Sequence, residues 1–284
     1  HMFIWQPEVD AALLPGPYAT PQAAVRAWFA VFFPGLKQPA DEAEVATQAW
    51  RLALAQTEVA QPAIFAIQAA LATLLMSFGV APDAVIGHSV GEVAGAYMAG
   101  ALSLEDAVRL VVLRGRIMQR ATGLGRMASV SLNAQEAAKA LAGYEDRLSI
   151  AAVNDLTSVV IAGETAALER LVQQLQARLI RCRYLRVNYA FHSPQMAPFQ
   201  SELRSALSWL RPQSAKIAMY STTRGARIDG AELGADYWAS GIREAVQFAQ
   251  AVEAARKDRH RIFLEVGPHP VLIGNLEQCL AEGG

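Results

Sequence analysis

The stretch AVIGHSVG, residues 84–91, decides the fold class of this 284-residue chain. Its first half is a short apolar run, which is typical of a buried strand. Its second half fits the pattern Gly-x-Ser-x-Gly, in which a serine lies at a sharp turn between a strand and a helix. Small residues predominate from Glu92 to Gly100, as expected for the helix that follows such a turn. We therefore predict an α/β fold with Ser89 at a strand-to-helix turn.

The residues of this turn suit a nucleophilic serine. Gly87 and Gly91 leave room for a tight turn and for close packing of the helix. The backbone N–H of Val90 would lie at the N-terminus of the helix, where it could stabilise an oxyanion. The alternative is an ordinary tight turn between a strand and a helix, because the pattern alone also occurs by chance.

Residues 127–187 have a periodicity of their own. The pattern predicts strands at 127–132, 148–153, 158–162 and 182–187, and helices at 134–141 and 165–179. Their β-α-β-β-α-β order is that of a ferredoxin-like unit. We predict that residues 127–187 form a small subdomain inserted into a catalytic body made of residues 1–126 and 188–284. The cleft between the two parts is the expected ligand site.

The larger part alternates between strands and helices. The pattern predicts a helical region at 39–76 that is broken near Pro62. Further strands are expected at 2–5, 217–221 and 261–266, and further helices at 197–210 and 245–255.

A nucleophilic serine needs a base, and histidine is the usual one. His192 lies in the stretch YAFHSP, where the chain returns from the insert to the larger part, so we expect it over the cleft. His88 adjoins Ser89 and is expected to face the packing or the pocket wall. His269 lies in a Gly-Pro-His-Pro turn and is the rival candidate. The position of His192 at a domain junction favours His192.

The overall composition excludes several classes of function. Hydrophobic residues make up 53% of the chain and charged residues 18%, which predicts a large core without disorder. A net charge of -1 gives no electrostatic reason to expect nucleic acid or an anionic membrane as a partner. The histidines and cysteines have no metal-ligand spacing, so no metal site is expected. The apolar stretches fall short of the ~20 residues that a membrane helix needs. We expect a soluble, cytoplasmic monomer.

Six stretches resemble one family, the malonyl-CoA:acyl-carrier-protein transacylases, and within it the acyltransferase domains of polyketide synthases. They are TEVAQPA (57–63), GHSVGE (87–92), GALSLEDA (100–107), LRGR (113–116), YAFHS (189–193) and EVGPHPVL (265–272). Their order and approximate spacing match those of the family. The resemblance implies an α/β-hydrolase-like body that carries a ferredoxin-like subdomain.

The resemblance also implies roles for individual residues. Ser89 would be acylated, and His192 would take its proton and later return a proton to the leaving thiol. The family orients this histidine with a main-chain carbonyl, and the matching position here is Gly241. Arg114 matches the arginine that holds the free carboxylate of the extender unit. A guanidinium group suits this task because it binds a carboxylate through two parallel hydrogen bonds.

The choice of extender unit is associated in the family with the residues that precede the base. The malonyl pattern is His-Ala-Phe-His and the methylmalonyl pattern is Tyr-Ala-Ser-His, whereas this chain has Tyr189 and Phe191 in a hybrid of the two. Phe191 would fill the space of an α-methyl group, which favours malonyl. One methyl group changes binding by only ~1–3 kcal/mol, so some methylmalonyl would also react.

One motif of the family is missing. Members usually begin with a strand that ends in Gly-Gln-Gly-x-Gln, whose first Gln supplies the second oxyanion donor. No such motif occurs in this chain, and Gln6 is the candidate for that backbone donor. Loss of one oxyanion donor lowers the rate by roughly 10²–10³ in other enzymes.

These observations favour a ping-pong acyltransferase of polyketide biosynthesis. Malonyl-CoA would be its substrate, an acyl carrier protein its acceptor, and neighbouring synthase domains its partners if the chain is part of a longer one. No permanently bound cofactor is expected. A serine esterase or thioesterase of related fold is one alternative, although it would need an acid between the serine and the histidine in chain order. A catalytically impaired scaffold domain is the other alternative.

Overall fold

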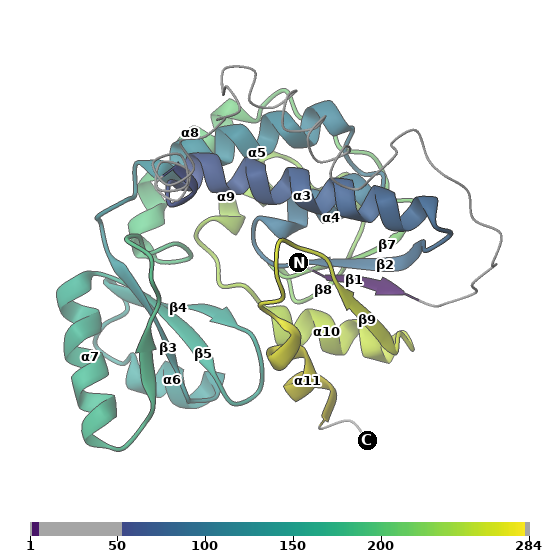
Figure 1. Cartoon of the computed structure of the whole chain (residues 1–284). Coiled ribbons are helices and arrows are strands. Elements are labelled where there is room, and N and C mark those ends of the chain that lie inside the picture. Colours follow the sequence, from purple (N-terminus) through teal and green to yellow (C-terminus); the bar gives the residue numbers. More distant parts are fainter. Residues whose placement is uncertain (1, 6–52, 282–284) are drawn as a thin grey trace, which may run out of the picture.

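The computed structural model describes residues 2–5, as backbone, and residues 53–281 (Figure 1). One of its two sheets has five strands in the order β8-β7-β2-β1-β9. The strands are β1 (Met2–Trp5), β2 (Pro82–Gly87), β7 (Ala218–Ser221), β8 (Ala226–Ile228) and β9 (Ile262–Glu265). β2 and β7 are parallel, whereas β1 is antiparallel to both of its neighbours and β8 is antiparallel to β7. The strand predicted at 2–5 is confirmed.

Helices cover both faces of this sheet (Figure 1). Strand β2 shows why, because its apolar side chains alternate between the faces. Val85 packs in one hydrophobic cluster, and Ala84 and Ile86 pack in another. The first cluster contains residues of α3 (Thr57–Ser77), α4 (Gly91–Met98), α5 (Leu104–Gln119), α8 (Ala197–Ala206) and α9 (Ala235–Gly241). The second contains residues of α10 (Phe248–Lys257) and α11 (Ile273–Ala281).

The other sheet has four strands in the order β4-β5-β3-β6, and every neighbouring pair is antiparallel. The chain order is the expected β-α-β-β-α-β. The elements are β3 (Arg126–Val130), α6 (Ala134–Ala140), β4 (Leu148–Val153), β5 (Val159–Gly163), α7 (Thr165–Ala177) and β6 (Cys182–Tyr184). One hydrophobic cluster joins both helices to one face of the sheet. This four-stranded unit lies beside the larger sheet (Figure 1).

A parallel β-bridge connects the two parts, between Ala152 of β4 and Val246. The N–H of Val153 donates to the carbonyl of Val246 at 2.8 Å, and the N–H of Val246 donates to the carbonyl of Ala151 at 2.9 Å. The helix predicted at 245–255 therefore begins only at Phe248, because Val246 takes part in this bridge. The helix predicted at 197–210 ends at Ala206.

Two predictions about α3 were wrong. The helix runs from Thr57 to Ser77 without a break, although Pro62 lacks the N–H that would bond the preceding turn. Packing against α4 and α5 compensates for that loss, and Pro62 itself is buried. The helix is also long and apolar enough to span a membrane by length and composition alone. In this structure 44% of its apolar window is buried inside the protein, and one such helix is by itself weak evidence for a membrane span.

Two short 3₁₀ helices complete the described elements. They are η1 (Pro194–Met196), which follows the His192 turn, and η2 (Gly230–Glu232).

Candidate active site

Ser89 lies at the turn between β2 and α4, and its φ angle is +52°. A positive φ is strained for a residue with a side chain, and such strain is concentrated at functional sites. Gly87 makes the turn sterically feasible, because a Cβ atom there would lie 2.3 Å from the N and Cα atoms of Glu92. The predicted strand-to-helix turn is thus present, with the strain that such a turn requires.

His192 is the hydrogen-bond partner of Ser89. Its Nε2 atom lies 2.8 Å from Ser89 Oγ, although the two residues are 103 positions apart in the sequence. Its Nδ1 atom lies 2.8 Å from the carbonyl oxygen of Glu244. Because a carbonyl can only accept, Nδ1 must carry the proton, which leaves the lone pair of Nε2 facing the serine hydroxyl. This is the tautomer that a general base needs.

The carbonyl that orients His192 was assigned to the wrong residue. It belongs to Glu244 and not to Gly241. Gly241 is the last residue of α9, and the chain makes one further turn in which the N–H groups of Arg243 and Glu244 both donate to the carbonyl of Ser240. That turn brings the carbonyl of Glu244, three residues later, to the imidazole.

The backbone of His192 is held from both parts of the protein. Its φ angle is +59°, which again is strained. Its N–H donates to the carbonyl of Ile242 at 3.0 Å, and its carbonyl accepts the hydroxyl of Ser149 on β4 at 2.9 Å. The histidine is therefore fixed between the smaller sheet and the segment after α9.

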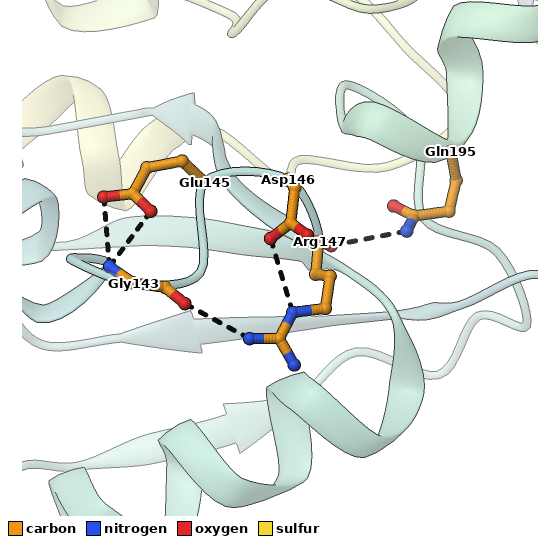
Figure 2. Close-up of polar contacts among 5 residues, drawn as sticks. All are labelled: Gly143, Glu145, Asp146, Arg147 and Gln195. Atoms are coloured by element: carbon orange, nitrogen blue, oxygen red, sulfur yellow. Dashed lines mark hydrogen bonds and ion pairs between the residues drawn. The ribbon is translucent and has the colours of Figure 1, made fainter.

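A second contact from the smaller sheet supports the His192 turn. The side chain of Gln195 donates to the carbonyl of Arg147 at 3.3 Å (Figure 2). Arg147 is the last residue of the loop before β4. Contacts within this loop stabilise it, since the guanidinium of Arg147 donates to the carbonyl of Gly143 and pairs with Asp146 (Figure 2). The carboxylate of Glu145 accepts from the N–H of Gly143 in the same loop (Figure 2).

Burial sets the protonation state of His192. Its side chain is 6% exposed, and burial followed by the positive charge of Arg114 lowers the pKa of His192 to about 4. The hydrogen bond to Glu244 acts in the opposite direction. The imidazole is therefore neutral at neutral pH, as a base must be.

Arg114 is buried beside Ser89, so it is not a solvated charge on a helix surface. It lies on α5, is 3% exposed and donates to Ser89 Oγ at 3.1 Å. A second guanidinium nitrogen donates to the side chain of Gln61 on α3, whose amide in turn donates to Thr57 at 2.8 Å. Burial lowers the pKa of Arg114 to about 10, so the side chain stays charged. No carboxylate within residues 53–281 forms an ion pair with it.

The rings of Tyr189 and Phe191 are stacked. Their centroids are 3.8 Å apart and their planes differ by 11°. Phe191 is buried in the core of the larger part, and Tyr189 packs against that core. Burial also raises the pKa of the Tyr189 phenol.

The two oxyanion candidates differ in position. The N–H of Val90 lies one residue after Ser89, just before α4, and has no backbone acceptor within the described residues. Gln6 lies outside the described residues. Strand β1 pairs Met2 with Ile86 and Trp5 with Pro82, so Trp5, its last residue, lies at the end of β2 that is far from Ser89. The role of Gln6 stays a prediction.

The other two histidines of interest lie apart from the serine hydroxyl. Nε2 of His88 lies 2.8 Å from the side-chain oxygen of Asn154, in the loop between β4 and β5. Burial lowers the pKa of His88 to about 3. His269 lies in an exposed loop after β9.

Sequence reasoning missed four residues that shape the site: Gln61, Glu92, Ser149 and Glu244. Gln61 and Glu92 lie within stretches that carry the family resemblance, so the motifs were a signal. Glu244 contributes its backbone carbonyl, and the hydroxyl of Ser149 donates to the backbone carbonyl of His192. No sequence motif marks contacts with backbone atoms. Within residues 2–5 and 53–281, no three His, Cys, Asp or Glu side chains are grouped so that they could hold a metal ion.

Fold and site together define a mixed α/β protein with a serine–histidine pair at a strand-to-helix turn and a buried arginine beside it. The family model described as "Acyl transferase domain" matches residues 38–283. The chain therefore belongs to the acyl transferase domain family.

Its relatives by sequence are much longer proteins. The chain is 44% identical over 228 residues to mycoketide-CoA synthase of Mycobacterium tuberculosis, which covers 80% of this chain and 6% of that protein. It is 40% identical over 261 residues to erythronolide synthase EryA2 of Saccharopolyspora erythraea, which covers 88% of this chain and 7% of that protein. The chain thus spans less than a tenth of either relative.

Two solved structures of similar fold are acyltransferases. The acyltransferase domain from module 8 of the salinomycin polyketide synthase aligns with a TM-score of 0.83 and 30% identity, over 99% of this chain and 67% of that chain. A loading acyltransferase from the avermectin modular polyketide synthase aligns with a TM-score of 0.82 and 33% identity, over 94% of this chain and 85% of that chain. The protein is accordingly a transferase similar to polyketide synthase acyltransferase domains.

Proposed function

We propose that the protein transfers a malonyl-type unit from coenzyme A to Ser89 and then to the phosphopantetheine thiol of an acyl carrier protein. The observation that carries this proposal is the hydrogen bond of 2.8 Å between Ser89 Oγ and a His192 whose other nitrogen is fixed by a carbonyl. The relatives are synthases, which supports a place in polyketide biosynthesis next to other synthase domains.

The first half-reaction follows from the geometry of the pair. Nε2 of His192 accepts the proton as Ser89 Oγ attacks the thioester carbonyl carbon. The N–H of Val90 stabilises the negative charge that develops on the carbonyl oxygen. The carbon–sulfur bond then breaks, and the proton on Nε2 passes to the departing coenzyme A sulfur. This leaves an acyl ester on Ser89 and a neutral His192.

The second half-reaction is the first in reverse with another thiol. Nε2 of His192 takes the proton of the carrier's pantetheine thiol, and the thiolate attacks the acyl ester. As the ester breaks, the proton returns to Ser89 Oγ. Neither half-reaction needs a bound cofactor.

Arg114 supports a substrate with a free carboxylate. The charge of Glu92 acts on the buried Arg114, but no carboxylate in the described residues is in ion-pair contact with it. An incoming carboxylate would accept two parallel hydrogen bonds from its guanidinium group. Because Arg114 donates to Ser89 Oγ, a carboxylate bound by Arg114 would lie close to the oxygen atom that attacks the thioester. The distance suits a malonyl unit, whose carboxylate and thioester share one carbon.

The stacked rings of Tyr189 and Phe191 support a preference for malonyl over methylmalonyl. Phe191 is buried and Tyr189 partly buried against the core, so the stacked pair cannot move aside for an added methyl group without losing its own contacts. We expect the preference to be moderate, in line with the ~1–3 kcal/mol that one methyl group is worth.

For the fold, we propose the description that the resemblance implied. Residues 1–126 and 188–284 would form an α/β-hydrolase-like body, and residues 127–187 a ferredoxin-like subdomain. The sheet order β4-β5-β3-β6 of the smaller unit supports this description.

A competition experiment tests the proposed function. The protein is mixed with equimolar malonyl-CoA and methylmalonyl-CoA, its intact mass is measured, and a carrier protein bearing phosphopantetheine is then added. We expect mainly a malonyl adduct that disappears as the carrier gains the same mass.

The Arg114→Ala variant separates the transferase from an esterase. We expect it to lose the preference for malonyl-CoA over acetyl-CoA, whereas a simple esterase would be indifferent to the change. Release of free malonate in place of transfer would favour a thioesterase. A folded protein without any adduct would favour a scaffold role.

A further inference from the structure

Glu92 is a buried carboxyl group that the proposed mechanism does not use. It lies on α4, three residues after Ser89, and is 2% exposed. Burial raises its pKa. No lysine or arginine in the described part of the chain forms an ion pair with it. A carboxyl group in such a place is unfavourable unless hydrogen bonds compensate for the lost water.

Glu92 collects hydrogen bonds from two separate segments. From the loop after β7, Oε1 accepts the N–H of Thr222 at 2.6 Å, and Oε2 accepts the hydroxyl of Thr223 at 3.0 Å. From α9, Oε2 accepts the hydroxyl of Tyr237 at 2.9 Å. Tyr237 in turn shares a hydrogen bond of 2.6 Å with Ser221. One carboxyl group therefore fastens α4, the loop after β7 and α9 to one another.

The helix α9 is the element that leads to the base. After α9 ends at Gly241, the carbonyls of Ile242 and Glu244 accept the backbone N–H and the Nδ1–H of His192. The loop after β7 packs on the same end of α9, because a Cβ atom at Gly241 would lie 3.2 Å from Thr223 Oγ1. A displacement of α9 relative to α4 would therefore move these two carbonyls relative to Ser89.

We propose that Glu92 is a positioning residue for His192. Its carboxyl group holds α9 in register with the helix that follows Ser89, and α9 then holds the two carbonyls that orient the imidazole. The nucleophile and the support of its base are thus connected by a single side chain. This proposal rests on the proposed function, because it assigns a role within the same site.

A test needs a matched pair of tyrosine variants, because Glu92 variants risk misfolding. Tyr237→Phe removes the hydroxyl that joins α9 to Glu92. Tyr220→Phe is the control: Tyr220 is also buried and also donates to a carboxylate, Asp258, at 2.6 Å, but it packs in the cluster on the opposite face of the sheet. Both variants lose one tyrosine–carboxylate hydrogen bond, and Tyr237→Phe also loses the hydrogen bond to Ser221. Only the bond between Tyr237 and Glu92 lies on the path to His192. Glu92→Gln is a third, isosteric variant.

The primary measurement is the tautomer of His192, from the ¹⁵N chemical shifts of its ring at pH 7. In the wild type and in Tyr220→Phe we expect the Nδ1–H form. In Tyr237→Phe and Glu92→Gln we expect a mixture in which Nε2–H is populated, because the acceptor at Nδ1 is displaced. This measurement requires no substrate, so it speaks about Glu92 even if malonyl-CoA does not react.

The second measurement is the rate at which Ser89 is acylated by p-nitrophenyl acetate, which needs neither coenzyme A nor a carrier. We expect Tyr237→Phe and Glu92→Gln to lower this rate by roughly 10- to 100-fold through misorientation of the base, with a smaller change in Tyr220→Phe. A pure Nδ1–H tautomer and an unchanged acylation rate in both Tyr237→Phe and Glu92→Gln would overturn the proposal. The same fall in rate in Tyr220→Phe would also overturn it, because the effect would then be a general loss of stability.

Discussion

The nucleophile and the base are held in place in different ways. Ser89 is positioned by its immediate neighbours in the sequence. The backbone N–H of Gly91 donates to the carbonyl of His88, and the backbone N–H of Glu92 donates to the carbonyl of Ser89. His192 is positioned by residues far away in the sequence, because its Nδ1 contact lies 52 residues along the chain and its contact with Ser149 lies 43 residues away. The position of the nucleophile is therefore encoded locally, whereas the position of the base depends on tertiary packing.

Substitution of Gly87 should have the largest effect, because it disrupts the tight turn that positions Ser89. In Gly87→Ala the new Cβ would meet backbone atoms of Glu92 at 2.3 Å, and a helix backbone cannot yield as a flexible side chain can. We expect a loss of stability of at least ~1–3 kcal/mol and a fall in Ser89 acylation of 10²-fold or more. Thermal unfolding and intact-mass kinetics with malonyl-CoA measure the two effects. A variant that is acylated at the wild-type rate would show that the turn is not a strict requirement.

The pH dependence of acylation probes the environment of the base. Since His192 must be neutral to accept a proton and its pKa is lowered to about 4, the rate should stay level from neutral pH to about pH 5 and fall below that. In Arg114→Gln the loss of a nearby positive charge should raise the pKa of His192, so the falling limb should move to higher pH. The measurement is the acylation rate by p-nitrophenyl acetate between pH 3.5 and 8. If the rate of the wild type already falls near pH 6.5, the imidazole of His192 is hydrated in solution and not buried.

Ser149→Ala removes one long-range support of the base. The lost hydrogen bond to the carbonyl of His192 is worth about 1 kcal/mol, so the acylation rate should fall by up to roughly fivefold. Binding of coenzyme A thioesters should be unaffected, so the effect should appear in kcat and not in KM. If KM rises instead, Ser149 contacts the substrate and not only His192.

Gly241→Ala should have the smallest effect and sharpens the assignment of the carbonyl. The new Cβ would lie 3.2 Å from the side-chain oxygen of Thr223, which can move by a few tenths of an ångström. Because the carbonyl that orients His192 belongs to Glu244, we expect less than about 1 kcal/mol of lost stability and a nearly unchanged acylation rate. A large loss of activity at unchanged stability would mean that Gly241 does take part in orienting His192.

The same contrast explains which features the sequence could predict. The turn at Ser89 was predictable because glycine spacing and an apolar run specify it within a few residues. The order of strands and helices in the smaller unit was predictable from periodicity. The continuous helix through Pro62 was not, because packing against α4 and α5 overrides a local break. The direction of β1 was not, because four residues with apolar character fit a sheet in either direction.

The candidate site shows the same limit. Ser89, His192 and Arg114 are side chains within motifs, and the structure brings all three together. The carbonyl of Glu244 was missed because any residue can supply a carbonyl, so its identity depends only on how the turn after α9 ends. The hydroxyl of Ser149 was missed for a related reason, since it acts on a backbone atom from another sheet.

The roles of Ser89 and His192 can be tested by the intact mass of the wild type, Ser89→Ala and His192→Ala after brief mixing with malonyl-CoA. We expect a single malonyl adduct on the wild type, none on Ser89→Ala, and a much slower adduct on a folded His192→Ala. An adduct that persists in Ser89→Ala, or one that forms at the wild-type rate in His192→Ala, would contradict the assignment of Ser89 as the nucleophile and His192 as its base.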